Sequence, residues 1–491
     1  MGEENGDLRR CGITAISGSS IRYGVTITRP LAADTAYVRE ISGSIHGPLP
    51  GVQPAIAGGL QLRTRVRRLL TFPMPGSTIA ALFLPHSKEV RMSTLRITDI
   101  KAIMCGPLPF TRVYTNEGIT GLGENVVSHP AILSAQVEML KSILVGEDPF
   151  NIERLWIKML QQTSFSYMNA MISAVDVALY DIKGKALGVP VYELLGGLYR
   201  RYIRLYPHMR GTWNSFPDPT QADLFSEPWG VVEYTPEQLG KFAKEIVDEG
   251  YTAMKFDPFK PGRDGYHAYR PDEIDAVVDR VAAVREAVGP SVDLMVECHG
   301  KFNAGTAIKI GKKLEQFDLF WYEEPVPVGM ITMMKRVADA VNIPIAACER
   351  LNSKVDLKEY LENGAVDVVM FDVGKVGGIT EAMKICAMCE AYQAKAAPHN
   401  PFGPVAAMAN AHLSAAVHPF LIQEHEQMAP WAVEPRLKIV DGYLEIPDLP
   451  GLGIELDEDA IAEANAKVAD GTYKPFSNAR DLDFGKYVPV L

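Results

Sequence analysis

The sequence predicts an α/β protein in which a parallel barrel of strands and helices follows a smaller α+β domain. The main observation is a unit of about 25 residues that repeats from Val292 to Glu424, each copy placing an ionisable residue after a short apolar run. A strand, a helix and two short loops take about that many residues. Strand-like alternation followed by helix-like periodicity, from Leu95 to Gly188, indicates a separate domain before the repeat.

Composition is that of an ordinary soluble protein, with 47% apolar and 22% charged residues. The net charge of −11 argues against nucleic acid or an anionic membrane as the main partner, but it leaves room for an anionic small substrate at a locally cationic site. The longest apolar run near the N-terminus, Ile79 to Leu84, is far shorter than the roughly 18 residues of a membrane helix.

The six cysteines are scattered and do not form a disulfide framework, so we expect a reducing, cytoplasmic compartment. Cys386 and Cys389 form a CxxC pair within EAMKICAMCEAY. Because that segment has helical periodicity, we interpret the spacing as a helix repeat and not as a redox or zinc motif.

Residues 1–91 differ from the rest of the chain in charge and composition. They hold 11 Lys+Arg and 6 Asp+Glu, a balance of +5, are rich in Gly, Ser, Pro and Arg, and show no sustained periodicity. We interpret them as a disordered extension, or as spurious sequence upstream of a start at Met92. An Arg-rich transit peptide and a basic binding arm are the alternatives.

Residues 92–200 read as the α+β domain. LRITDIKAIMC alternates as a strand does, and RVYTNEGITGLGE continues with a turn at Asn116–Gly118. Residues 130–161 and 168–187 have helical periodicity, and Gly188 with Pro190 ends the second of these segments.

The barrel is predicted over residues 201–428, with its first strand in Tyr202–His208 and its second in Tyr251–Pro258. The 209–250 insertion between them exceeds a usual loop, so it is a lid, a specificity loop or a passive surface insertion. Residues 429–491 read as a hairpin and turn that return to the first domain, followed by a helix near Glu458–Val468.

The ionisable residues of the repeat form a regular series. Their spacings are 26, 26, 23, 27 and 25 residues, and the series is Glu297, Glu323, Glu349, Asp372, His399 and Glu424. In a parallel barrel the carboxyl ends of the strands converge on one face, where catalysis takes place. The alternative is that these residues are unrelated N-caps of the following helices.

Glu297, Glu323 and Glu349 offer hard oxygen ligands from successive strands. Three carboxylates gathered in a closed site repel one another unless they are protonated or bind a cation, and oxygen-only ligation suits Mg²⁺, with Mn²⁺ as a substitute. The alternative is ion pairing, for example with Lys301 or Arg350.

Two histidines accompany these three carboxylates in the repeat. His399 follows Asp372 by one βα unit, so the carboxylate of Asp372 could orient the imidazole as a general base requires. His299 lies two residues beyond Glu297, and strand alternation would place both side chains on the same side.

The order of these motifs resembles the enolase superfamily, in its mandelate racemase subgroup. The resemblance covers roughly residues 94–470 and includes TNEGITGLGE, AVDVALYDIKGKALGVPVYELLGG, EEP, CER, D-x-x-K-x-G-G and HNPFGP. It implies a modified (β/α)7β barrel with a capping domain formed by the N- and C-terminal segments. It also implies a homo-oligomer.

Carried over by position, the resemblance makes Glu297, Glu323 and Glu349 Mg²⁺ ligands and His399, paired with Asp372, the base that removes a proton α to a carboxylate. Glu424 would hydrogen-bond the substrate carboxylate. The first ligand of this subgroup is commonly Asp, whereas here it is Glu297.

A racemase of this subgroup carries a K-x-K pair on the second barrel strand, but this chain has Lys255-Phe256-Asp257. We expect Lys255 and Asp257, with Glu424, to contact the substrate. His299, in Glu-Cys-His-Gly-Lys, is similar to the general acid of galactonate-type acid-sugar dehydratases. The resemblance therefore implies dehydration of an aldonate to a 2-keto-3-deoxy sugar acid. A cycloisomerase, an epimerase, a non-catalytic sugar-acid-binding relative and a basic binding arm on a barrel scaffold are the alternatives.

Overall fold

The computed structural model describes residues 94–106, 108–126, 130–163, 168–209, 234–426 and 429–470, all within one compact unit. At residues 130 and 131 only the backbone is described. The predicted extension 1–91 lies outside these ranges, as does most of the predicted 209–250 insertion. None of the described helices is long and apolar enough to cross a membrane.

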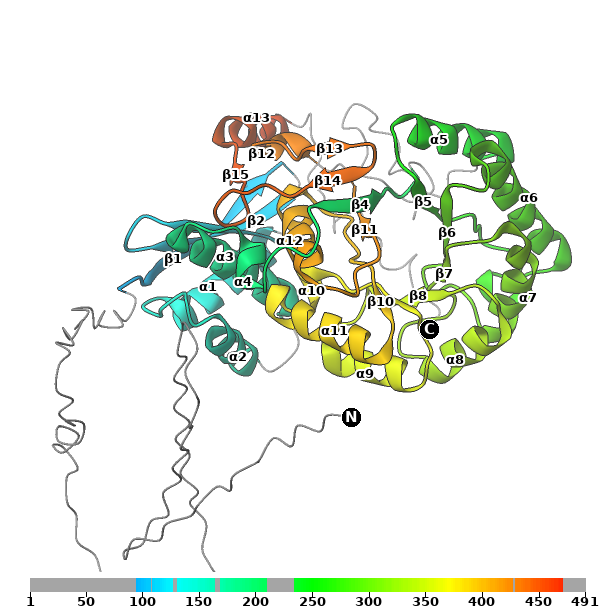
Figure 1. Ribbon diagram of the computed structural model, residues 1–491, viewed down its shortest axis with the longest axis horizontal. Helices are drawn as coiled ribbons and strands as arrows, with labels where there is room; N and C mark the ends of the chain where they lie inside the picture. Colours follow the sequence, from blue (N-terminus) through cyan, green and yellow to red (C-terminus); the bar gives the residue numbers. More distant parts are fainter. Residues whose placement is uncertain are drawn as a thin grey trace, which may run out of the picture. The chain divides into compact units, whose positions relative to one another are not determined.

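The predicted parallel barrel is confirmed (Figure 1). Its strands are β4 (Tyr202–Tyr206), β5 (Ala253–Phe256), β6 (Asp293–Glu297), β7 (Trp321–Glu323), β8 (Ile345–Ala347), β9 (Val368–Val369), β10 (Lys395–Ala396) and β11 (Gln423–Glu424). Strands β5 to β10 form one parallel sheet, and β11 pairs in parallel with β4. Parallel bridges His208–Lys255 and Ala396–Phe420 close the ring.

Helices connect the barrel strands and cover their outer face (Figure 1). They are α5 (Pro236–Asp248), α6 (Pro271–Val288), α7 (Ala304–Leu314), α8 (Ile331–Ala340), α9 (Lys354–Glu362), the short α10 (Val373–Val376), α11 (Gly378–Tyr392) and α12 (Pro404–Ala416). The chain enters the ring at β4 and leaves it at β11 without a closing helix, which is the (β/α)7β order. Cys386 and Cys389 lie on α11 with buried thiols, as the helical interpretation of their spacing requires.

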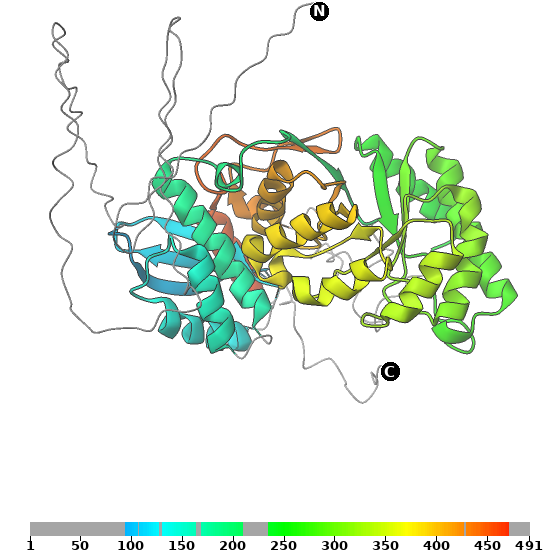
Figure 2. The same ribbon diagram turned by 60° about the horizontal axis from the view of Figure 1, so that its bottom comes forward.

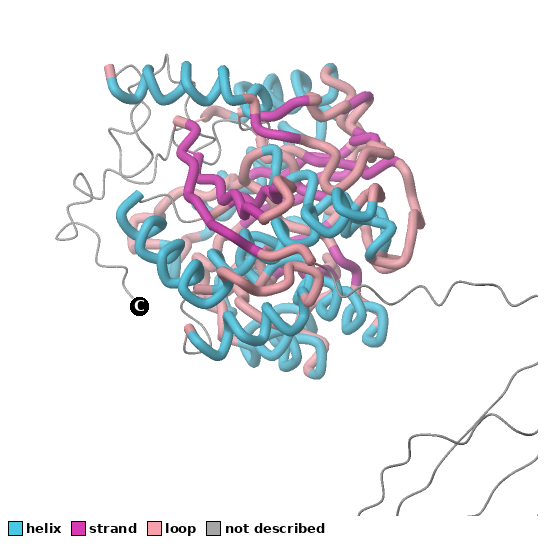
Figure 3. The backbone as a smooth tube through the Cα atoms, turned by 90° about the vertical axis from the view of Figure 1, so that its left-hand side faces the viewer, coloured by secondary structure: helices cyan, strands magenta, loops and turns pink. Residues whose placement is uncertain are grey.

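The capping domain begins with an antiparallel sheet of β1 (Ile97–Cys105), β2 (Leu108–Thr115) and β3 (Thr120–Glu124). The helical segment predicted over 130–161 is divided into α1 (Pro130–Leu144) and α2 (Ile152–Gln162), because Gly146 takes a left-handed conformation between them. Figure 3, viewed from the side of this domain, shows its strands together with the flanking helices.

Helix α3 (Asn169–Leu187) lies between the capping sheet and the barrel helices α10 and α11 (Figure 2). It is buried on nearly all sides, which explains why its sequence is rich in small and apolar residues and weakly amphipathic.

The C-terminal segment contacts both parts of the molecule. The hairpin of β13 (Ile439–Val440) and β14 (Tyr443–Glu445) pairs with β4 of the barrel, so the prediction that it returns to the first domain was wrong for this element. Helix α13 (Glu458–Ala469) does reach the capping domain, where the Asn465 side chain bonds the backbone of Met104 and Gly106.

Buried carboxylates of the capping domain hold the amino ends of barrel helices. Asp176, on α3, accepts hydrogen bonds from the backbone N–H of Thr380 (2.9 Å) and from its hydroxyl (2.6 Å) at the start of α11. Gly378 makes this approach possible, since a Cβ there would lie 2.3 Å from Asp176 Oδ2. Glu124 similarly accepts from the backbone N–H groups of Gly403 and Ala406 at the start of α12.

Replacing Asp176 with Ala should lower the free energy of unfolding by about 2–4 kcal/mol, because two buried donors of Thr380 lose their acceptor. Urea denaturation followed by circular dichroism measures the change. The matched control, Asp275→Ala, removes an exposed carboxylate on α6 and should change stability by less than about 0.5 kcal/mol. Equal effects of the two changes would contradict a stabilising role for the Asp176–Thr380 contact.

Candidate active site

Alternation along the barrel strands decides which side chains enter the interior. On β6, Leu294 and Val296 pack among the residues between strands and helices, whereas Met295 belongs to the small cluster inside the barrel. Because successive side chains point to opposite faces, Glu297 follows Met295 inward. The same two-residue step leads from other interior residues to site residues: from Ala253 to Lys255 and Asp257, from Trp321 to Glu323, from Met370 to Asp372, from Ala397 to His399, and from Ile422 to Glu424.

The three predicted ligands come together. Glu297, Glu323 and Glu349 are buried, and each offers a carboxylate oxygen within 4.8 Å of the others. We call these three residues the carboxylate trio. Burial and the charge of Glu297 raise the pKa of Glu323 well above its usual range. Burial alone would raise the pKa of Glu297 as well, but the charges of His299 and Lys255 hold it well below its usual range.

Lys255 supplies positive charge beside the trio. Its Nζ lies 2.9 Å from Glu323 Oε1, 3.2 Å from Glu424 Oε1 and 3.5 Å from Glu297 Oε2, and its side chain is 2% exposed. Burial alone would lower the pKa of Lys255, but the surrounding carboxylates raise it well above its usual range. This ammonium therefore joins two members of the trio to Glu424.

His399 lies on the Glu349 side of the trio. Its Nδ1 is 3.2 Å from Asp372 Oδ2, the pairing that the sequence suggested, and its Nε2 is 3.1 Å from Glu349 Oε2 and 3.6 Å from Glu424 Oε2. Asp372 also caps α10 by accepting the Gly374 N–H at 2.7 Å. The N-cap interpretation thus holds for Asp372 in addition to its contact with the imidazole.

His299 lies near Glu297, a different member of the trio from the one that His399 contacts, but strand alternation is not the reason. Strand β6 ends at Glu297, and His299 has a left-handed backbone with φ of 51°. Its N–H donates to Glu297 Oε1 at 2.5 Å, and its ring Nδ1 lies 2.7 Å from Asp257 Oδ2. The expectation that the strand continues to His299 was wrong, since a turn places the residue.

Ion pairing, the alternative to a metal site, is present at the trio: Lys255 pairs with Glu297 and Glu323, and Arg350 pairs with Glu349. Lys301 contacts Asp257 instead of a trio member. Arg350 does approach Glu349, at 3.3 Å, but it also lies 3.4 Å from Glu324. Burial raises the pKa of Glu324 to about 8, with the charge of Glu349 acting in the same direction.

Sequence reasoning missed two residues that line the same region. His208 follows β4, is buried, and has its ring centroid 6.4 Å from that of His299; burial lowers its pKa to about 4. Tyr206, on β4, has a buried hydroxyl that no described group bonds, and its ring lies 5.8 Å from Lys255 Nζ. Strand alternation could have identified both, because Tyr206 points into the barrel and His208 stands two positions after it in the predicted first strand.

The donor set fits a hard divalent cation. Three buried carboxylates supply oxygen ligands only, which suits Mg²⁺ or Mn²⁺ better than zinc. The unbonded hydroxyl of Tyr206, in the same barrel interior, is a polar atom that a bound ion's water or substrate could satisfy. Glu297, Glu323 and Glu349 are the residues that would hold the ion.

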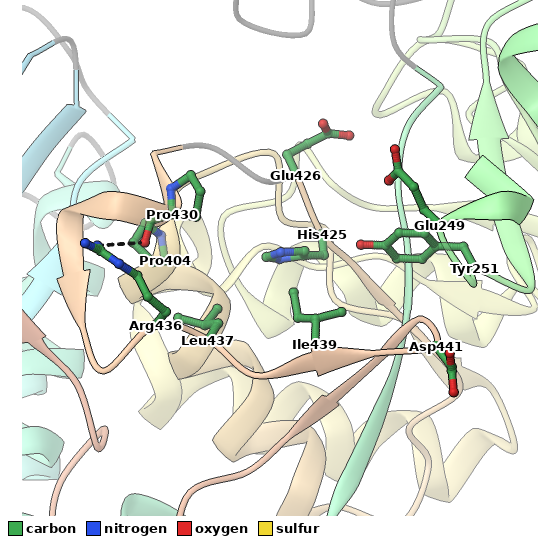
Figure 4. A pocket seen from close by; sticks show the side chains of 10 residues that line it. All are labelled: Glu249, Tyr251, Pro404, His425, Glu426, Pro430, Arg436, Leu437, Ile439 and Asp441. Atoms are coloured by element: carbon green, nitrogen blue, oxygen red, sulfur yellow. Dashed lines mark hydrogen bonds between the residues drawn. The ribbon is translucent and has the colours of Figure 1, made fainter. Parts of the chain in front are cut away.

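A hollow of about 460 Å³ is lined by none of the carboxylates or histidines described above (Figure 4). It is lined by His425, the residue after Glu424, together with Tyr251, Ile439 and Asp441. Two adjacent residues at the end of β11 therefore face different sides: Glu424, the last residue of the strand, meets Lys255 inside the barrel, while His425, just after the strand, faces this hollow.

Comparison with known proteins agrees with this architecture. Residues 96–196 match the mandelate racemase / muconate lactonizing enzyme N-terminal domain, and residues 238–460 match the enolase C-terminal domain-like family. A D-xylonate dehydratase of Haloferax volcanii is 35% identical over 383 residues, which cover 74% of this chain and 88% of that protein. A D-galactonate dehydratase of Xanthomonas oryzae pv. oryzae is 34% identical over 377 residues, 74% of this chain and 92% of that protein.

A solved structure of a member of the enolase superfamily from Salmonella Typhimurium is 34% identical, with a TM-score of 0.67, and the match covers 75% of this chain and 98% of that one. The match thus extends over nearly all of that chain, capping domain and barrel alike. With both domain matches and the barrel geometry in agreement, the chain belongs to the mandelate racemase/muconate lactonizing enzyme family of the enolase superfamily.

Proposed function

We propose that this enzyme is a Mg²⁺-dependent dehydratase that converts an aldonate to a 2-keto-3-deoxy sugar acid and water. The observation that supports the proposal is that two imidazoles, His399 and His299, lie beside different members of the buried carboxylate trio, Glu349 and Glu297. Abstraction of a proton α to a carboxylate takes a base and protonation of a leaving hydroxyl takes an acid, and these two imidazoles can fill the two roles.

Similarity supports the reaction class and the type of substrate. The family and the named relatives make the chain a hydro-lyase of the enolase superfamily acting on a sugar acid. Because those relatives are named for D-xylonate and D-galactonate, a pentonate and a hexonate, these two aldonates are the first candidates for its substrate.

In the proposed reaction His399 removes the C2 proton through Nε2, because Nδ1 is engaged by Asp372. Asp372 holds the ring in one orientation and stabilises the imidazolium that forms. The electron pair of the broken C–H bond moves toward the substrate carboxylate, giving an enediolate. His399 Nε2 already contacts Glu349, a member of the trio. The substrate carboxylate would lie beside the trio.

Lys255 would contact the substrate carboxylate. Glu424 was expected to hydrogen-bond that carboxylate, but its ion pair with Lys255 leaves it an acceptor, so the donor that this pair presents is the Lys255 ammonium. A buried, hydrogen-bonded ammonium is a strong stabiliser of the negative charge that develops in the enediolate. When bound, Mg²⁺ supplies the remaining positive charge that offsets the trio and the enediolate.

His299 would protonate the C3 hydroxyl as the C3–O bond breaks, so that water leaves and an enol remains. The enol then tautomerises to the 2-keto-3-deoxy acid. Two-base racemisation is disfavoured, because Asp257 stands where a second lysine base would be and is engaged by His299 and Lys301. A cycloisomerase or epimerase on the same scaffold is the remaining alternative.

A screen of an acid-sugar library in the presence of Mg²⁺ tests the proposal directly. We expect D-xylonate, D-galactonate or another aldonate to give a 2-keto-3-deoxy product, detected colorimetrically and by NMR. Absence of turnover with every aldonate and aldarate would exclude the dehydratase function.

Replacing Glu323 with Gln should weaken Mn²⁺ binding by at least about 10- to 100-fold, since one charged oxygen ligand is lost while the hydrogen bond from Trp321 can persist. Electron paramagnetic resonance of free Mn²⁺ measures the affinity without reference to turnover. The control Glu445→Gln, on the C-terminal hairpin, should bind Mn²⁺ as the native protein does. Unchanged binding by the Glu323 variant would contradict its assignment as a ligand.

Replacing His299 with Asn should slow dehydration by about 10²-fold or more. Exchange of the substrate C2 proton with solvent deuterium should be preserved, because the base remains in place. Proton NMR in D₂O measures exchange, and product analysis measures dehydration. His399→Asn is the matched comparison and should lose both reactions. If the His299 variant also loses exchange, acid and base are not separate groups.

A further inference from the structure

The backbone after β6 fixes where His299 stands but leaves its ring orientation to be set by other groups. His299 and Gly300 both have left-handed backbones, with φ of 51° and 67°, and the Lys301 N–H donates to the Cys298 carbonyl at 3.1 Å. A turn with two left-handed central residues is tight and directs the chain sharply away from the strand.

Asp257 reaches the His299 ring from the neighbouring strand β5. Its Oδ2 lies 2.7 Å from His299 Nδ1 and also accepts from Lys301 Nζ, while its Oδ1 accepts the Phe259 N–H at 3.0 Å. Its side chain is only 6% exposed. Both carboxylate oxygens are thus bonded within the protein, which is the geometry of a group that orients a side chain rather than one that binds a substrate.

Lys301 keeps this buried carboxylate charged. Its Nζ contacts Asp257 and lies 5.4 Å from the centroid of the Tyr266 ring and 5.9 Å from that of Phe259. Burial alone would raise the pKa of Asp257, but the neighbouring Lys301 and His299 hold it below its usual value. An ionised Asp257 accepts the Nδ1–H of His299, so that Nε2 is the ring nitrogen left to exchange a proton.

The arrangement repeats the pairing of the proposed base. His399 follows β10 and its Nδ1 contacts Asp372, which follows β9; His299 follows β6 and its Nδ1 contacts Asp257, which follows β5. In each pair the aspartate comes from the preceding strand of the barrel. From these contacts we propose that Asp257, held by Lys301, is the positioning residue of His299, so that two Asp–His dyads adjoin the carboxylate trio, one beside Glu297 and the other beside Glu349.

This inference rests on the proposed function of His299 as the general acid. The test replaces Asp257 with Asn, using whichever of D-xylonate and D-galactonate the enzyme converts. Asn has no charged oxygen, so it cannot replace the carboxylate oxygen that accepts from both His299 and Lys301. We expect dehydration to fall by about 10²-fold or more, with C2 proton exchange and Mn²⁺ affinity within about threefold of native values. Lys301→Met should also lower the ratio of dehydration to exchange. Lys301→Arg should keep that ratio near its native value.

A double variant separates positioning from other roles. If Asp257 acts through His299, the double change Asp257→Asn/His299→Asn is no slower in dehydration than His299→Asn alone. Additive losses, or equal losses of exchange and dehydration in Asp257→Asn, would overturn the positioning role and favour substrate binding or a general structural effect. The proposed function fails separately, if His299→Asn by itself retains dehydration.

Discussion

The buried ammonium of Lys255 is the interaction on which the interior of the barrel depends. It lies within 3.5 Å of carboxylate oxygens of Glu297, Glu323 and Glu424, all with almost no exposed surface. Carboxylates brought this close in a medium of low polarity repel one another strongly unless a positive charge or a proton intervenes. Lys255 supplies part of that charge from within the fold, and a divalent cation on the trio would supply the rest.

Buried carboxylates of the capping domain also hold barrel loops that carry the site. Glu124 accepts from backbone N–H groups of Gly403 and Ala406, and so holds the HNPFGP segment that begins at His399. The amino end of a helix favours a negative charge, which lowers the cost of burying these carboxylates. Burial still raises the pKa of Glu124 to about 7 and that of Asp176 to about 7. The position of the proposed base is therefore linked to the contact between the two domains.

Strand alternation explains how much of the site could be predicted. Most site residues stand two positions after an interior residue, so their inward direction follows from the period of a strand. Glu349 is the exception, because it stands three positions after the interior residue Ala346. The intervening Cys348 has a left-handed backbone, with φ of 99°, which changes the direction of the chain before the ligand. No pattern in the sequence predicts that Cys348 adopts this left-handed conformation.

The sequence by itself determined the repeating strand–helix unit, the trio, and the pairing of His399 with Asp372, because all three depend on period and on neighbouring units along the chain. The contact of Lys255 with the trio and with Glu424 appeared only in the tertiary structure, since closing the ring brings β5 and β11 to either side of β4. The Asp257–His299 pair also appeared only there. Its members are 42 residues apart, and a left-handed turn, which local sequence does not specify, decides where the imidazole stands.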